Sequence, residues 1–117
     1  MLVLTKYADL IRELVAKENE KDQNWKWSVK SIGKTVVRIR WGYLDYLEEK
    51  ENCFRVVVSD DSYDGSSFIT ARTPDGQMIE GFIVAETPNP KIGCEQTIES
   101  GIRDAVSHIA YCAHSRY

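Results

Sequence analysis

The sequence predicts an α+β domain in which a mostly antiparallel sheet of about five strands is flanked by an N-terminal and a C-terminal helix, both packed on one face. Three observations predict this fold. Apolar residues recur with a helical period at both ends of the chain, they alternate with polar residues between 25 and 43, and turn-forming residues separate successive strand-like runs. Strands that follow one another through short turns pair antiparallel. At 117 residues the chain fits a single domain, residues 1–117.

The first predicted element is a helix that begins near Thr5. The hydroxyl of Thr5 is a candidate N-cap because it can accept a hydrogen bond from an unpaired backbone N–H. A polar run from 18 to 24 ends the helix. The apolar residues fall on one stripe of a helix with 3.6 residues per turn, and they are Tyr7, Leu10, Ile11, Leu14 and Val15.

A β-hairpin follows, because the apolar period changes to two over residues 25–30 and again over 35–43. The residues 31–34 between the two runs include a glycine and form the turn. We expect a three-residue loop, 32–34, which pairs Trp27 with Ile39 and Lys26 with Arg40. This register keeps the apolar and basic side chains on separate faces of the hairpin.

The later elements are three strands and a long helix. Residues 53–59, 68–73 and 78–86 are predicted strands, and a Pro-Asp-Gly turn joins the last two. The stretch 44–52 fits either an extended strand or a helical turn. The last helix is expected to run from Gly93 or Cys94 to Ser115, with acidic residues in its first turns and basic residues at its end.

The charge distribution points to a binding surface. Residues 25–44 hold five of the chain's 15 Lys and Arg residues and none of its 18 Asp and Glu residues. Like charges crowded on one sheet face are unfavourable, so two explanations stay open. Acids such as Glu48, Glu49 and Glu51 offset the basic charges, or an anionic partner does. The candidate binding residues are Lys26, Lys30, Lys34, Arg38 and Arg40.

The tryptophans and the net charge disfavour a nucleic-acid partner. Stacking of bases needs exposed aromatic rings on the charged face, and the alternation places Trp25, Trp27 and Trp41 on the opposite, core-facing side. A net charge of −3 and a pI near 5.4 also differ from those of a general nucleic-acid binder. The order of elements resembles that of double-stranded-RNA-binding domains. Those domains have a basic start to their last helix, whereas here the start reads Cys94-Glu95-Gln96, so no function is inferred from this resemblance.

The last helix carries a strip of small residues that allows another backbone to approach closely. A glycine inside a helix costs about 1 kcal/mol relative to alanine, so its presence calls for a packing reason. One explanation is tight packing of this helix on its own sheet, and the other is a helix-to-helix contact in a homodimer. The candidate self-association residues are Gly101, Ala105, His108 and Cys112.

The residues provide no convincing metal or catalytic site, and we expect no cofactor. His108 and Cys112 are four residues apart, but zinc needs at least three protein ligands. Residues 60–65 match the opening of a calcium loop, yet Ala71 stands where that loop needs a bidentate glutamate. Cys94 lies near a predicted helix N-terminus, which lowers a thiol pKa, but no histidine is close to it on that helix. The chain is therefore expected not to be an enzyme.

The remaining features predict a cytoplasmic protein without a membrane span. The apolar residues that open the chain are too few for a signal-peptide core, and no run approaches the length of a transmembrane helix. Three cysteines at scattered positions are expected to be free thiols in a reducing compartment.

Two functional hypotheses follow from the sequence. The first is a non-enzymatic interaction module that masks or inhibits an acidic macromolecular partner through the basic hairpin face, as phage- or plasmid-type inhibitor proteins do. The alternative is a small-ligand module that holds a nucleotide or another phosphate-bearing metabolite. In that case Arg38 and Arg40 would contact phosphate oxygens, for which the planar guanidinium is suited, and Tyr43 or Tyr46 would lie near the base.

Overall fold

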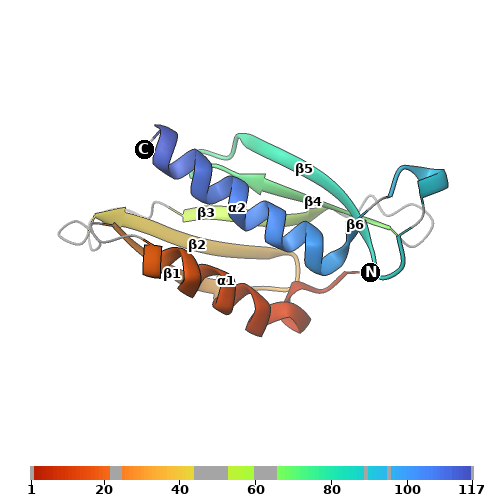
Figure 1. Ribbon diagram of the computed structural model, residues 1–117, viewed down its shortest axis with the longest axis horizontal. Helices are drawn as coiled ribbons and strands as arrows, with labels where there is room; N and C mark the ends of the chain where they lie inside the picture. Colours follow the sequence, from red (N-terminus) through yellow and green to blue (C-terminus); the bar gives the residue numbers. More distant parts are fainter. Residues whose placement is uncertain are drawn as a thin grey trace.

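The computed structural model describes residues 2–21, 25–43, 53–59, 66–88, 90–94 and 96–116, and it confirms the α+β architecture (Figure 1). Within these ranges six strands form one sheet in the order β1 to β6. Neighbouring strands pair antiparallel except β5 and β6, which are parallel. The helical elements are η1 (Leu4–Tyr7), α1 (Ala8–Lys21), η3 (Pro90–Ile92) and α2 (Ile98–Arg116). The strands are β1 (Trp25–Ile32), β2 (Val36–Tyr43), β3 (Cys53–Ser59), β4 (Ser67–Arg72), β5 (Met78–Ala85) and β6 (Gln96–Thr97).

Both helices lie against the same face of the sheet, as expected from the sequence (Figure 1). The core between the two layers contains Ile11 of α1, Phe54 of β3 and Ile109 of α2, all at most 1% exposed. No described element covers the opposite face of the sheet, which we call the open face. Among the described residues no helix is long and apolar enough to cross a membrane.

The N-terminal helix begins differently from the prediction. A 3-10 turn at Leu4–Tyr7 precedes α1, and its N-cap is Val3, which makes no side-chain cap hydrogen bond. Thr5 lies inside this turn, so its predicted N-cap role is wrong. The start of the helix is held instead by the buried Leu4, whose backbone N–H donates to the Lys34 carbonyl at 2.8 Å.

The register of the first hairpin was also predicted incorrectly. Trp27 pairs with Trp41, and it is Val29 that pairs with Ile39. The Gly33 N–H donates to the Val36 carbonyl at 2.8 Å, which leaves a two-residue turn, 34–35, in place of the expected loop 32–34. Lys26 likewise pairs with Gly42 and not with Arg40.

A β-bulge keeps the apolar and basic side chains of this hairpin on separate faces. The register shifts between Val29 and Ser31, so that Lys30 is an extra residue in β1. Without the bulge, the register set by the turn would pair Lys30 with the buried Ile39. Lys30 would then lie on the core face, because a register shift of one residue moves every side chain of a strand to the other face. The predicted separation of faces is therefore present, with Trp27 3% exposed on the core side and Arg38 exposed on the other.

The last helix starts later than predicted. Its first residue is Ile98, because Gln96 and Thr97 form the short strand β6 beside β5. Thr97 then caps the helix: its Oγ1 accepts a hydrogen bond from the Ser100 N–H at 3.1 Å. The ambiguous stretch 44–52 and the calcium-like loop 60–65 lie outside the described residues.

Candidate functional site: an arginine row on the open sheet face

The alternation along β2 places two of the predicted binding residues on the open face. Val37 and Ile39 are fully buried in the core between the sheet and the helices. Because successive side chains of a strand point to opposite faces, Arg38 and Arg40 emerge on the side away from the helices. Arg38 is exposed and Arg40 is partly buried.

Two further arginines from other strands join them. Arg38 is the direct cross-strand partner of Arg55 on β3, and Arg55 is in turn the partner of Arg72 on β4. Side chains in such positions share a face and have Cβ atoms roughly 4.5–5.5 Å apart. Three guanidinium groups therefore come from three adjacent strands along one line, and we call Arg38, Arg55 and Arg72 the arginine row.

Sequence reasoning missed Arg55 and Arg72 because neither belongs to the basic stretch 25–44. The alternation around Arg55, which lies between the buried Phe54 and Val56, indicates an outward side chain. What the pattern does not supply is the register of β3 against β2 and β4. The row exists only because that register aligns three residues separated by 17 positions each.

Hydrogen bonding differs along the row. The Nε of Arg72 donates to Thr70 Oγ1 at 3.2 Å and its Nη1 donates to the Gly76 carbonyl at 2.9 Å, which fixes its guanidinium. No side-chain hydrogen bond or ion pair in the described part of the chain involves the guanidinium group of Arg38 or Arg55. Two of the three row members thus keep their donors available for a ligand.

Arg40 lies next to the row, opposite the buried Cys53. Its Nε is buried and has no hydrogen-bond partner among the described residues. A buried donor without a partner costs about 1–3 kcal/mol, so this nitrogen is an unfavourable feature of the unbound protein.

Acidic side chains are absent from the open face of the described strands. The two ion pairs of the described residues, Lys17–Glu13 and Lys21–Glu18, are both on α1. The offsetting role suggested for Glu48, Glu49 and Glu51 falls outside the described residues. The strand positions that share the open face with the row, as the cross-strand pairs define it, are Lys26, Ser28, Ser31, Val36, Arg40, Cys53, Val57, Ser59, Phe68, Thr70, Met78, Gly81 and Ile83.

An apolar strip runs beside the arginine row. Val36 is the cross-strand partner of Val57, and each lies two residues along its strand from a row arginine. Both valines are partly exposed. Beyond them Phe68 lies over Gly81, where an added Cβ would overlap the phenyl ring. The open face therefore combines a line of positive charge with an adjoining apolar surface.

The other predicted basic residues are more scattered. Lys26 lies on β1 at the edge of the sheet, Lys30 is the bulge residue and Lys34 lies in the hairpin turn. All three are exposed.

The small-residue strip of α2 packs against its own sheet. An added Cβ at Gly101 would overlap Val84 Cγ1 of β5, so the glycine permits close contact between helix and sheet. Ala105 and Cys112 are buried in the same core. His108 is partly exposed, with its Nδ1 2.8 Å from the Asp104 carbonyl oxygen. Gly101 thus permits close packing of α2 on its own sheet, as the first explanation expects, and the homodimer contact stays a prediction.

The cysteines and histidines of the described part are distributed over β3, the segment before β6 and α2. Cys94 precedes the first residue of α2 by four positions, and its Sγ lies 3.7 Å from the carbonyl oxygens of Ile83 and Gln96. The three cysteines are free and buried. Among the described residues no group of three or more His, Cys, Asp or Glu could hold a metal ion.

No family model, no curated protein and no solved structure matches this chain.

Proposed function

We propose that this protein is a non-enzymatic interaction module that binds and masks an acidic segment of a partner protein through the open face of its sheet. The observation that carries the proposal is the arginine row, in which Arg38, Arg55 and Arg72 are direct cross-strand neighbours. Like charges directly opposite each other destabilise a sheet. A bound anionic segment would offset that repulsion, which explains why three arginines are neighbours on this face.

The surface around the row favours a protein partner over a nucleic acid. Val36 and Val57 provide apolar area beside the charges, as in protein interfaces that combine apolar and charged contacts. Phe68, the aromatic residue of the open face in the described strands, lies over Gly81 and is partly buried. Stacking of bases needs exposed aromatic rings on the charged face, so this face favours a protein partner.

Binding of an acidic polypeptide to matched variants tests this function. Poly-L-glutamate is the probe, and its affinity is measured by isothermal titration calorimetry near physiological ionic strength. The double variant R38Q/R55Q removes two row charges, and we expect it to weaken binding about tenfold or more because two charge-assisted contacts are lost.

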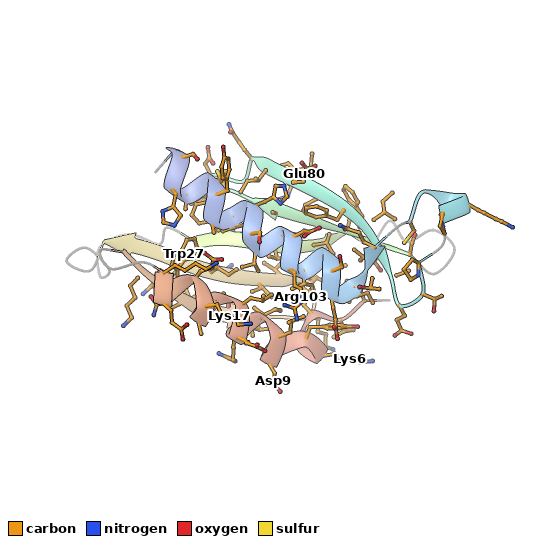
Figure 2. The ribbon with its side chains drawn as sticks, viewed as in Figure 1. Lys6, Asp9, Lys17, Trp27, Glu80 and Arg103 are labelled. Carbon is orange, nitrogen blue, oxygen red and sulfur yellow. The ribbon has the colours of Figure 1, made fainter. Side chains whose placement is uncertain are left out.

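The control removes the same charge from the other side of the molecule. Lys6 and Arg103 are exposed on the helical layer (Figure 2), so K6Q/R103Q matches the change in net charge without touching the row. We expect it to bind poly-L-glutamate with nearly unchanged affinity. Equal losses in both double variants would show a general charge effect and contradict the proposal.

Affinity capture with the same variants then identifies the natural partner. A genuine partner is retained by the wild type and by K6Q/R103Q and lost with R38Q/R55Q. Retention by all three proteins at physiological salt would place the binding surface elsewhere.

A further inference from the structure

We infer that the arginine row is a subsite for a phosphate monoester, carried by a phosphorylated residue of the partner segment, with Arg55 as its central ligand. This inference rests on the proposed function and deepens it, because it names the chemical group that the row recognises.

The charge of the row is better matched by a dianion than by a carboxylate. Three arginines are direct cross-strand neighbours on one face, and none of them forms an ion pair with a carboxylate of the described residues. A single aspartate or glutamate brings one negative charge, whereas a phosphate monoester brings nearly two at neutral pH, together with three acceptor oxygens. One phosphate can therefore contact several neighbouring guanidinium groups at once.

The hydrogen bonds along the row favour a central position at Arg55. Arg72 is held by Thr70 and Gly76, so its Nη2 is the nitrogen without a contact among the described residues. Arg38 and Arg55 have no contact that occupies their forks in the described part. A phosphate above Arg55 would receive two N–H groups from its fork, and the flanking Arg38 and Arg72 lie one strand away on either side.

Arg40 provides a second contribution. It shares the open face with the row and lies two residues from Arg38 on the same strand, and its Nε lacks a partner in the described part of the chain. A side-on contact with a phosphate oxygen, reached by rotation of this side chain, would give that nitrogen an acceptor.

The apolar strip indicates that the phosphate belongs to a polypeptide. Val36 and Val57 adjoin Arg38 and Arg55 on the same face and are partly exposed. A free phosphate or the phosphate of a nucleotide would leave this strip uncovered. A peptide that places its phosphate on Arg55 and an apolar side chain on the valines covers both surfaces.

Three synthetic peptides that differ at one central residue test the inference. The central residue is phosphoserine, glutamate or serine, and the flanking residues are identical and include valine and aspartate. Fluorescence anisotropy at physiological ionic strength is expected to show that the phosphoserine peptide binds about tenfold tighter than the glutamate peptide. The serine peptide is expected to bind weakest.

Variants at one position separate charge from fork geometry. R55K keeps the charge but removes the planar fork, and we expect it to abolish most of the preference for phosphoserine over glutamate. R103K on α2 is the matched control and is expected to leave the preference intact. A preference that survives in R55K would overturn the central role of Arg55.

The outcomes distinguish this inference from the proposed function. Equal binding of the phosphoserine and glutamate peptides overturns the phosphate subsite and leaves the acidic-partner function standing. If the affinity for poly-L-glutamate is the same in R38Q/R55Q as in the wild type, the proposed function itself is overturned. Competition experiments with inorganic phosphate and with adenosine monophosphate identify the source of the phosphate. If either competitor binds as tightly as the phosphopeptide, the assignment to a peptide is overturned.

Discussion

Arg38 on β2 and Arg55 on β3 are direct cross-strand partners on a sheet face that no described helix covers. Arg72 extends the pair to a third strand. Proteins usually avoid like charges in this position because they repel each other. The repulsion within the row lowers the stability of the unbound protein, as is common where residues are placed for binding and not for stability.

Neutralising the central arginine should stabilise the unbound protein. R55Q removes repulsion with both neighbours, and we expect the free energy of unfolding to rise by about 0.2–1 kcal/mol. Salt screens this repulsion, so the gain should shrink as ionic strength increases. Urea denaturation at low and high salt measures both effects.

R103Q on the exposed face of α2 is the control for this experiment. It removes the same charge without relieving a cross-strand contact. A gain of equal size in R103Q, or a loss of stability in R55Q, would show that the row is not under electrostatic repulsion.

A methyl group added at Gly101, where α2 packs closely on β5, should destabilise the fold. A methyl group at Gly101 would overlap the buried Val84, whose β-branched side chain has little rotamer freedom. We expect G101A to cost about 1–3 kcal/mol in unfolding free energy, even though alanine favours helix by about 1 kcal/mol. S107A, at an exposed position of the same helix, should be neutral or slightly stabilising. The double variant G101A/V84A should lose less than the sum of the two single losses, and strict additivity would contradict the overlap.

Two threonines allow a direct test of which residue caps a helix. Thr97 Oγ1 accepts the Ser100 N–H, whereas Thr5 lies inside the 3-10 turn and makes no cap. We therefore expect T97A to lower the unfolding free energy by about 1 kcal/mol and T5A to have little effect. Chemical denaturation of the two variants measures the difference. The reverse ranking would mean that α1 starts with a threonine cap, as the sequence pattern predicted.

Tyr7 should make the protein less stable at alkaline pH. Burial raises the pKa of the Tyr7 phenol, and the carboxylates of Glu86 and Glu99 raise it further. The unfolded chain loses this proton near the usual pKa of about 10, while the folded chain keeps it. The stability contributed by Tyr7 is thus fully present below that pH and falls as the pH rises toward the folded pKa.

The measurement is the unfolding free energy of the wild type and Y7F from about pH 9 to about pH 11. Subtracting the two curves removes the titration of the other groups. We expect a smaller decline in Y7F. Curves with the same slope would show that Tyr7 titrates alike in the folded and unfolded states.

The sequence predicted what depends on local periodicity. The apolar stripe from Tyr7 to Val15 gave the first helix, the alternation gave strand positions such as Cys53–Ser59, and the Pro-Asp-Gly turn gave the β4–β5 hairpin. The outward direction of Arg38 and Arg40 follows from the same alternation.

Features that depend on register or tertiary pairing were not predictable in this way. The bulge at Lys30 changes the partner of Trp27 without leaving a mark in the apolar pattern. Strand β6 is two residues long and exists through its pairing with β5. Arg55 and Arg72 reach the candidate site through the alignment of three strands, which local sequence does not encode.

Mapping the bound ligand onto the sheet tests directly whether the open face is the binding surface. We would record ¹H–¹⁵N correlation spectra of the labelled protein while adding the phosphoserine peptide at physiological ionic strength. We expect the largest shift changes on β2, β3 and β4, at Arg38, Arg55 and Arg72 and at the adjoining Val57. Changes confined to α1 and α2, or no changes at saturating poly-L-glutamate and peptide, would contradict the claim that the open arginine face is the binding surface.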